Sequence, residues 1–344
     1  MLEIIIGIGA LFVLAIFYLI FRITVLAGVA KDSSGKPSKG TSNAIFFVFF
    51  LIVGGGLTYW YSVYEFDNYT LPIASEHGIE IDRIFWITMA VTGIVFVITH
   101  ILLFIFPYRY RFSEKRRALF YPDNNKLELL WTVVPAIALA VLVFSGWKVW
   151  TDVTTKAPEE AEVVEIFGYQ FAWKARYPGK DGQLGDYDYR LIDVENELGM
   201  DFSDRNAMDD FVEGTEIHIP KGEPVLFKIR ARDVLHSVFM PEFRMKMDAV
   251  PGMPTNFWFT PSKTTEEMRA ELDDPDFNYF IYCTEVCGRG HFSMRVRVVV
   301  DEPEDYEKWY AEQKPWLSKN PEYLAKVPDD MKELASLAAG VEDK

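Results

Sequence analysis

The sequence predicts an α + β protein, in which membrane-spanning helices are followed by a β-sandwich or barrel and then by a helical C-terminal tail. Two observations lead to this fold class. The first 150 of the 344 residues carry nearly all the long apolar runs, whereas the remainder is rich in Asp, Glu, Pro and aromatic residues. From about Ala161, short runs of β-branched and aromatic residues are bounded by Gly, Pro and Asp, which is typical of strands joined by turns. We therefore expect a membrane part and one sizeable globular part.

Four apolar stretches in the first part are long enough to cross a bilayer, which takes roughly 20 residues of helix. The first stretch resembles a signal peptide, but its apolar region is longer than usual and no small-residue cleavage pattern follows closely, so we expect a retained helix. Pro135 lies inside the fourth stretch, where neighbouring helices satisfy the carbonyl that proline leaves free. The predicted spans are Leu2 to Leu26, Ala44 to Tyr61, Ile84 to Phe106 and Leu129 to Trp150.

Charges beside the spans predict their orientation, because Lys and Arg collect on the cytoplasmic side. Basic residues follow the first and third spans, whereas acidic residues occupy the connection between the second and third. The globular part after Trp150 is therefore expected in the periplasm of a plasma-membrane protein. The basic residues are Arg22, Lys31, Lys36, Lys39, Arg109, Arg111, Lys115, Arg116, Arg117 and Lys126, and the acidic residues are Glu65, Asp67, Glu76, Glu80 and Asp82.

Short strands without intervening helical patterns predict a sandwich or barrel in the globular part. After Glu302 the composition becomes charged and helical, so we expect a tail with helices near Tyr306 to Gln313 and Asp329 to Leu337. The predicted strands are Glu162 to Phe167, Gln170 to Tyr177, Glu216 to Ile219, Pro224 to Ala231, Asn256 to Thr260, Tyr279 to Cys283 and Ser293 to Val300. The predicted regions are an extra two-helix membrane region (1–82), a helix hairpin (83–150), the globular domain (151–301) and the tail (302–344).

An acidic stretch from Asp181 to Glu213 interrupts the strand pattern, with only Arg190 and Arg205 as basic residues. We expect a solvated surface insertion; the alternative is a docking face for a basic partner. The whole chain has a formal net charge of −15, which argues against binding nucleic acid and favours a basic protein partner.

The two cysteines lie in one short segment, Cys283-Thr-Glu-Val-Cys287-Gly-Arg-Gly-His291-Phe-Ser-Met294. Thiolate and thioether are soft donors that select copper, and imidazole also binds copper readily. A methionine argues against structural zinc. A mononuclear blue-copper site uses one cysteine, so the second thiol favours two copper ions bridged by sulfur. The alternative is a disulfide between Cys283 and Cys287, which leaves His291 and Met294 unexplained.

A two-copper site needs a second imidazole, and the chain has only five histidines. His77 lies in a membrane loop and His100 in a span, so neither is expected to reach the cysteines. His218 lies in a predicted strand and reads as a packed or surface residue. His236 follows the strand that ends near Ala231, and a loop leaving the sandwich there would meet the cysteine segment.

Several segments together resemble subunit II of cytochrome c oxidase, over roughly residues 83 to 300. They are the cysteine segment, Asp233 to His236, Met247-Asp-Ala-Val-Pro-Gly252 and Leu127-Glu-Leu-Leu-Trp-Thr-Val-Val-Pro-Ala136. The resemblance implies a cupredoxin-like domain with a binuclear copper-A centre. The implied ligands are Cys283, Cys287, His236, His291, Met294 and the backbone carbonyl of Glu285.

The same resemblance implies three further roles. The side chain of Glu285 would help hold a magnesium ion shared with subunit I, although alone it reads as a surface acid. Glu128 would stand at the entrance of a proton channel, although an acid at a helix start is also favoured by the helix dipole. Electrons would arrive at Trp173 with Phe171 beside it, within Gly168-Tyr-Gln-Phe171-Ala-Trp173. This run departs from the family pattern of two tryptophans, and Arg232 replaces a common acid.

The resemblance implies an electron-transfer subunit of a proton-translocating cytochrome c oxidase. Subunit I, which would hold the haems and copper-B, and subunit III are the expected partners, within a larger respiratory assembly. No Cys-x-x-Cys-His occurs, so the donor would be a separate cytochrome c or c-type cytochrome domain. Quinol oxidase relatives lose the copper ligands, and nitrous oxide reductase lacks a four-span anchor. An alternative from another class is a membrane-anchored copper-binding or assembly protein.

Overall fold

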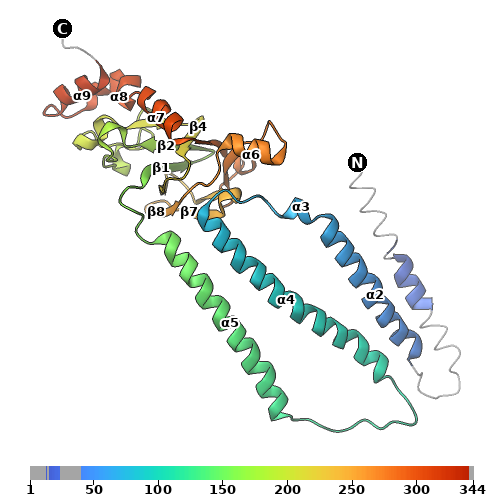
Figure 1. Cartoon of the computed structure of the whole chain (residues 1–344). Helices are drawn as coiled ribbons and strands as arrows, with labels where there is room; N and C mark the ends of the chain where they lie inside the picture. The colour runs from blue at the N-terminus through green and yellow to red at the C-terminus, as the bar shows by residue number, and fades with distance from the viewer. Residues whose placement is uncertain (1–12, 14, 24–39, 341–344) are drawn as a thin grey trace. The chain divides into compact units, whose positions relative to one another are not determined.

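The computed structural model describes residues 13, 15–23 and 40–340. The chain divides into two compact units, one of residues 1–70 and 86–138 and the other of residues 71–85 and 139–344. The helices before the sandwich are α2 (Thr41–Tyr64), α3 (Phe66–Tyr69), α4 (Glu76–Arg109) and α5 (Asn125–Thr154) (Figure 1).

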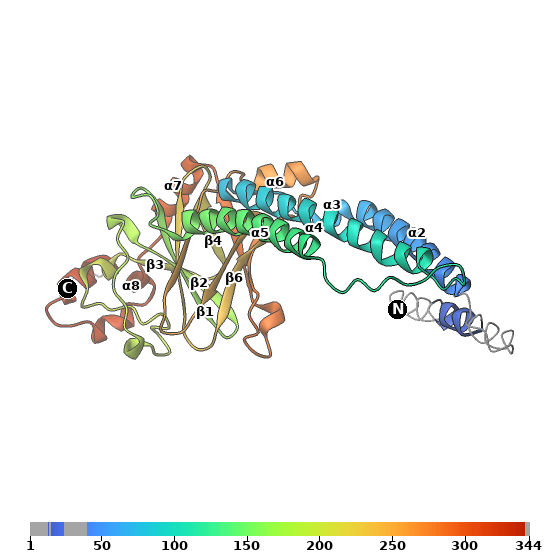
Figure 2. The ribbon, with the colours of Figure 1, turned by 90° about the horizontal axis from the view of Figure 1, so that it is seen from below.

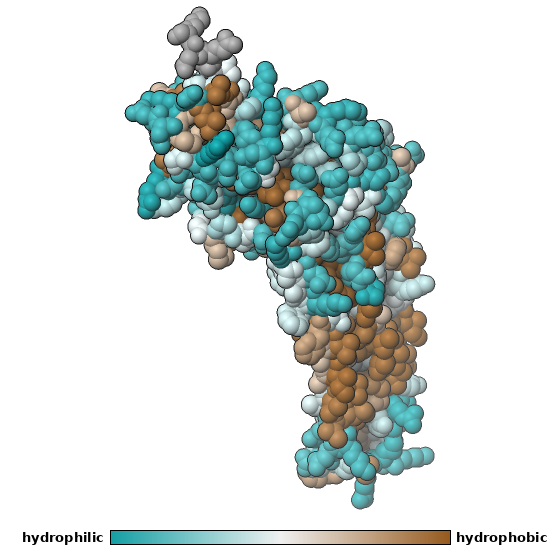
Figure 3. Space-filling model, turned by 60° about the vertical axis from the view of Figure 1, so that its left-hand side comes forward, coloured by the Kyte–Doolittle hydropathy of each residue, from teal (hydrophilic) through white to brown (hydrophobic). Residues whose placement is uncertain are grey.

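Three helices in the described part of the chain, α2, α4 and α5, are long and apolar enough to span a membrane, where four spans were expected. The first predicted span, Leu2 to Leu26, lies largely outside the described residues, although residues 15–23 are helical. Apolar side chains cover the outside of the long helices (Figure 3), and none of the most apolar window of α4 or of α5 is buried. Lipid or neighbouring helices must cover so large an apolar surface.

Helix α4 begins at Glu76, well before the predicted span at Ile84. The Ser75 hydroxyl accepts the Gly78 N–H at 3.0 Å, as an N-cap side chain does, and this bond stabilises a start outside the apolar window. Helix α5 likewise runs past both ends of its predicted span.

The globular part is a β-sandwich, as predicted, and its two sheets each have five strands (Figure 2). One sheet has the order β3-β2-β1-β5-β8 and the other β4-β10-β9-β6-β7. β1 pairs with β5 and β10 with β4 in parallel, and the other pairs are antiparallel. The strands are β1 (Glu162–Tyr169), β2 (Ala172–Tyr177), β3 (Phe211–Glu213), β4 (Glu216–Pro220), β5 (Val225–Ala231), β6 (His236–Met240), β7 (Met245–Ala249), β8 (Thr255–Phe259), β9 (Tyr279–Cys283) and β10 (Arg295–Asp301).

The main core lies between the sheets, because alternate residues of each strand point inward. β9 shows the pattern: Tyr279, Ile281 and Cys283 are buried, whereas the two residues between them are only partly so. The predicted strands all occur, each within two residues of its expected bounds. β3, β6, β7 and helix α6 (Thr265–Leu272) were not predicted. The 3-10 helices are η1 (Gly179–Asp181), η2 (Tyr189–Leu191), η3 (Arg205–Met208), η4 (Pro241–Phe243), η5 (His291–Ser293) and η6 (Pro321–Lys326).

The acidic stretch is not the solvated insertion expected from its composition, and that interpretation is wrong. Its apolar side chains form a second core with the segment after β10, where the helices are α7 (Pro303–Glu312), α8 (Trp316–Lys319) and α9 (Lys332–Ala339). Composition misleads here because the apolar residues are sparse and bury themselves against another segment. The buried members include Leu198, Met200, Phe202, Met208, Trp316, Leu317 and Tyr323.

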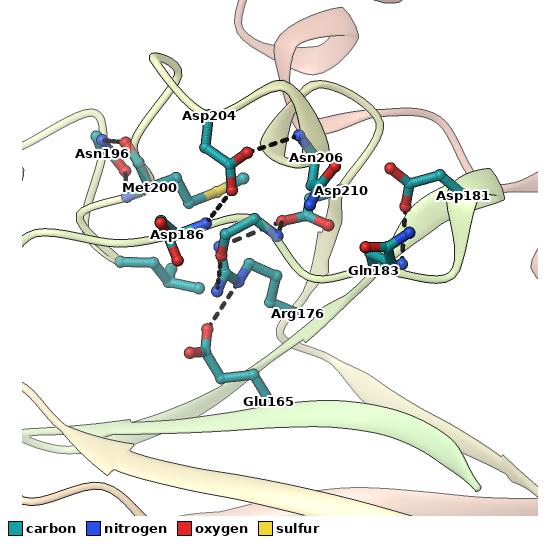
Figure 4. A network of polar contacts seen from close by, with 12 residues as sticks. Glu165, Arg176, Asp181, Gln183, Asp186, Asn196, Met200, Asp204, Asn206 and Asp210 are labelled. Carbon is teal, nitrogen blue, oxygen red and sulfur yellow. Dashed lines mark hydrogen bonds and ion pairs between the residues drawn. The ribbon is translucent and has the colours of Figure 1, made fainter. Parts of the chain in front are cut away.

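Several acidic residues of this stretch organise its backbone. Asp204, for example, accepts the backbone N–H groups of Asn206 at 3.1 Å and Asp186 at 2.7 Å (Figure 4). Asp181 accepts the Gln183 N–H in the same way. Such turns and caps satisfy backbone donors that have no partner within a strand or helix. The high acid content therefore has a structural use.

A buried ion network joins this stretch to the sandwich (Figure 4). Arg176, which is 1% exposed, contacts Glu165 at 2.8 Å and Asp210 at 3.2 Å. Glu165 also binds Arg230 at 2.6 Å. Burial alone would raise the pKa of Glu165, but the two guanidinium groups hold it below its usual value. Burial raises the pKa of Asp210 to about 8 despite Arg176.

Candidate metal centre

The segment after β9 returns to β10 as a closed loop, because the Cys283 N–H donates to the Met294 carbonyl at 3.1 Å. Gly290 lies against the ring of Phe171, and a Cβ there would be 2.5 Å from the ring. Gly288 adopts a φ of +133°, which favours glycine. The glycines are therefore needed for the loop to pass close to Phe171.

The two cysteine sulfurs lie side by side but are not bonded. Cys283 Sγ is 3.9 Å from Cys287 Sγ, and both cysteines are free and buried. A disulfide needs about 2.05 Å, so the disulfide alternative is wrong for this structure. Burial, and then the neighbouring Cys283, raise the pKa of the Cys287 thiol to about 11. Two adjacent thiolates here would need a cation between them.

Each sulfur faces its own imidazole. His236 Nδ1 is 3.8 Å from Cys283 Sγ, and His291 Nδ1 is 3.7 Å from Cys287 Sγ. Met294 Sδ is 3.8 Å from Cys287 Sγ, and the Glu285 carbonyl oxygen is 3.2 Å from Cys283 Sγ. Ligands about 2.0–2.3 Å from one metal at tetrahedral angles are roughly 3.3–3.8 Å apart, so this donor set fits soft metal ions.

Among the described residues, one group of side chains of the types His, Cys, Asp and Glu is placed to hold a metal ion. Its members are His236, Cys283 and Cys287. Their ligand atoms lie within 4.8 Å of one another. His236 is the first residue of β6 instead of a loop residue, which corrects the expected placement. Because Val238 pairs with Cys283 across β6 and β9, the sheet itself sets the His236–Cys283 separation.

Asp233 orients His236, a role that motif reasoning did not assign. Its Oδ1 is 2.9 Å from His236 Nε2, so Nε2 donates and Nδ1 is left facing the sulfur. Burial alone would raise the pKa of Asp233, but hydrogen bonds from the Gln170 backbone N–H and from His236 hold it below its usual value. The sequence feature that could have revealed this role is a carboxylate, Asp233, three residues before the candidate ligand His236. Gln170 also donates through Nε2 to the Cys287 carbonyl at 2.5 Å.

Comparisons with known proteins decide the family. A family model described as cytochrome c oxidase subunit II, periplasmic domain, matches residues 162–301, and the transmembrane-domain model of that subunit matches residues 58–149. A relative from Bradyrhizobium diazoefficiens, named alternative cytochrome c oxidase subunit 2, is 38% identical over 244 residues, which cover 71% of this chain and 83% of the relative. The chain belongs to the cytochrome c oxidase subunit II family.

More distant subunit II relatives match a similar share of the chain. The cytochrome c oxidase subunit 2 of Thermostichus vulcanus is 27% identical, over 69% of this chain and 76% of that protein. The protein of the same name from Cereibacter sphaeroides is 29% identical, over 66% of this chain and 75% of that protein. Membership makes this chain a membrane-protein component of a haem-copper oxidase, an oxidoreductase that takes part in electron transport.

The two aromatic residues expected to receive electrons differ in exposure. Trp173 is 1% exposed and packs edge-on against His236, with ring centroids 5.8 Å apart. Phe171 is 37% exposed. The ring of Trp173 is therefore inaccessible at the domain surface, whereas the ring of Phe171 is accessible there.

The side chains of Glu285, Glu128 and His218 are not members of this metal-binding group. The Glu285 side chain is exposed on the cysteine loop. Glu128 is an exposed residue in the first turn of α5 and belongs to the other compact unit. His218 lies in β4 and contacts Asp301 at 2.6 Å, as suits a packed strand residue.

Proposed function

We propose that this chain receives electrons one at a time from a c-type cytochrome and passes them towards the haem of subunit I. The observation that supports this most is the pair of free sulfurs 3.9 Å apart, each faced by an imidazole at 3.7–3.8 Å. Such a donor set would hold a binuclear copper-A centre, which supplies one-electron redox chemistry with little change of geometry. The proposed ligands are His236, Cys283, the Glu285 carbonyl, Cys287, His291 and Met294.

The protein's part in this reaction is to hold the donor atoms still. His236 is 0% exposed and its ring is fixed by Asp233, while the β6–β9 pairing fixes Cys283. Fixed ligands keep the reorganisation that accompanies each electron small.

Electron paramagnetic resonance of the purified oxidase tests the proposal. One unpaired electron shared over two copper nuclei is expected. A single-nucleus pattern would instead support a copper-binding or assembly protein.

Met294 is expected to affect the reduction potential of the copper centre more than the binding of copper. Met294→Leu keeps nearly the same volume at a site that is 2% exposed, so the fold is retained. We expect copper to stay bound and its reduction potential to shift, because a thioether is a weak ligand. Potentiometric titration measures the shift, with buried Met240→Leu as control. Complete loss of copper would contradict this assignment.

We place the outer end of the electron path at Phe171, which touches the cysteine loop at Gly290 and is partly exposed. Phe171→Leu should lower the second-order rate of reduction by cytochrome c by about tenfold, as expected for an aromatic contact at the centre of an interface. Stopped-flow reduction measures this rate. Phe280→Leu on strand β9 of the other sheet is the control, and an unchanged rate in Phe171→Leu would place the path elsewhere.

The copper domain is proposed to lie on the periplasmic side of the plasma membrane, because basic residues collect in the α4–α5 connection. Arg109, Arg111 and Arg116 are members of that group. A basic donor suits the chain's net charge of −15. We further propose contacts with subunits I and III and within a larger respiratory assembly, which mild-detergent co-purification would identify.

The exposed Glu285 carboxylate would hold magnesium with subunit I, and loss of bound magnesium in Glu285→Gln would support this.

Glu128 is proposed to mark the entrance of a proton channel in subunit I, since it is an exposed acid at the start of α5. Glu128→Gln removes the charge at nearly constant size. Turnover should fall while copper spectra stay the same, as oxygen-consumption assays and resonance spectra would show. Exposed Glu114→Gln is the matched control, and full turnover in Glu128→Gln would end this proposal.

A further inference from the structure

Arg244 adopts a backbone conformation that arginine rarely takes. It lies between η4 and β7 at a φ of +54°, in the left-handed region that favours glycine. The hydrogen bonds of the half-buried guanidinium compensate for this backbone strain. They go to a carboxylate and to backbone carbonyls. Nε and Nη2 form a fork on the Asp82 carboxylate at 2.7 and 2.9 Å. The other bonds go to the carbonyls of Leu71, Pro72 and Pro241.

Apart from Pro241, which belongs to η4, these partners lie in the first turns of α4 and in the segment that leads into it. Asp82 belongs to α4, and Leu71 and Pro72 precede that helix. All of them belong to the same compact unit as the sandwich. Arg244 thus joins the copper domain to the end of a membrane-type helix.

Backbone hydrogen bonds continue the same junction. The Ala74 N–H donates to the Glu242 carbonyl at 2.8 Å, and the Ser75 hydroxyl donates to the Phe243 carbonyl at 2.8 Å. Ser75 is fully buried and also caps α4 through Gly78. A Cβ on Gly78 would meet Ser75 Oγ at 2.9 Å and Arg244 Cγ at 3.3 Å, so the junction is closely packed.

The junction connects directly to the metal ligands. Arg244 lies in the turn between β6 and β7, and β6 begins with His236. β6 also pairs with β9, which ends at Cys283. Any shift of this turn relative to α4 would therefore move the metal centre through one continuous sheet.

We propose that Arg244 is a positioning residue for the electron step out of the copper centre. By locking the β6–β7 turn onto α4, it sets the distance between the copper centre and the haem of the partner chain. This inference rests on the proposed function. Electron transfer between separate centres falls steeply with distance, so a small displacement of the domain slows that step without altering the ligands.

Flash-induced reduction of the purified oxidase separates the two electron steps. In Arg244→Gln, which loses the fork but keeps a long side chain, the copper-to-haem rate should fall on the order of tenfold. The two-copper resonance signal and the rate of reduction by cytochrome c should match the wild type. Arg244→Lys, which keeps the charge with fewer bonds, should give an intermediate rate.

Asp82→Asn tests the same contact from its other side and serves if Arg244→Gln does not assemble. It should slow the same step, and combining it with Arg244→Lys should add little further loss, because both act on one contact. Lys246→Gln, an exposed charge two residues from Arg244, should leave the rate unchanged. A wild-type copper-to-haem rate in Arg244→Gln would overturn the proposal. If Arg244→Gln does not assemble, a wild-type rate in Asp82→Asn would overturn it. Absence of the two-copper signal from the wild-type oxidase would instead overturn the proposed function.

Discussion

Cys287→Ser is expected to abolish the signal of an electron shared between two copper ions. Cys287 Sγ lies 3.7–3.9 Å from three other donor atoms: Cys283 Sγ, His291 Nδ1 and Met294 Sδ. A serine oxygen is a hard donor and binds copper poorly in place of a thiolate. Electron paramagnetic resonance of the oxidase, with metal analysis on the same sample, measures the outcome.

Thr284→Ser is the matched control for Cys287→Ser, because Thr284 is an exposed residue of the same loop and is not one of the proposed ligands. It should leave the signal intact. A two-copper signal that persists in Cys287→Ser would refute the bridging role of this sulfur.

Arg176→Met is expected to destabilise the globular domain by about 3–5 kcal/mol, the usual cost of removing one partner of a buried ion pair. The arginine is 1% exposed, and its loss leaves the buried Glu165 with Arg230 alone and takes a hydrogen-bond donor from Asp210. Methionine fills a similar volume, so the effect reports charge more than packing. Thermal unfolding of the detergent-solubilised chain, followed by tryptophan fluorescence, measures it.

Arg297→Met is the control, since its ion pair with Glu216 on the surface of β10 is worth at most about 1 kcal/mol. An equal loss in both variants would mean that the buried network has no special role. Asp210→Asn should cost less than Arg176→Met at pH 7, because a carboxyl with a pKa of about 8 is mostly protonated there.

The raised pKa of Asp210 also predicts a pH dependence. The folded value of about 8 lies above the ordinary 3.8, so the folded state binds the proton more tightly than the unfolded state. Its contribution to stability is full below about pH 4 and is lost as the pH rises through 8. Unfolding midpoints measured between pH 5 and 9 should decline less steeply in Asp210→Asn.

The positions of the strands were largely predictable, because successive side chains of a strand point alternately into the core and out of it. β6 and β7 were missed, since polar and charged residues such as Ser237, Lys246 and Asp248 interrupt the pattern. β3, with only three residues, is too short to produce one. The acidic stretch was misjudged because its sparse apolar residues find their partners more than 100 residues later, in the segment around Trp316 and Tyr323.

The sequence by itself predicted a copper site, because two thiols, an imidazole and a thioether within twelve residues suit few metals besides copper. The membrane-spanning segments were also predictable, since a helix that crosses a bilayer needs only sufficient length and apolar side chains. The tertiary structure decided which distant groups meet those ligands. The β6–β9 pairing brings His236 to Cys283, Asp233 turns its ring, and Arg244 binds a helix more than 160 residues away in the chain. These contacts depend on sheet register and backbone direction, which no local pattern encodes.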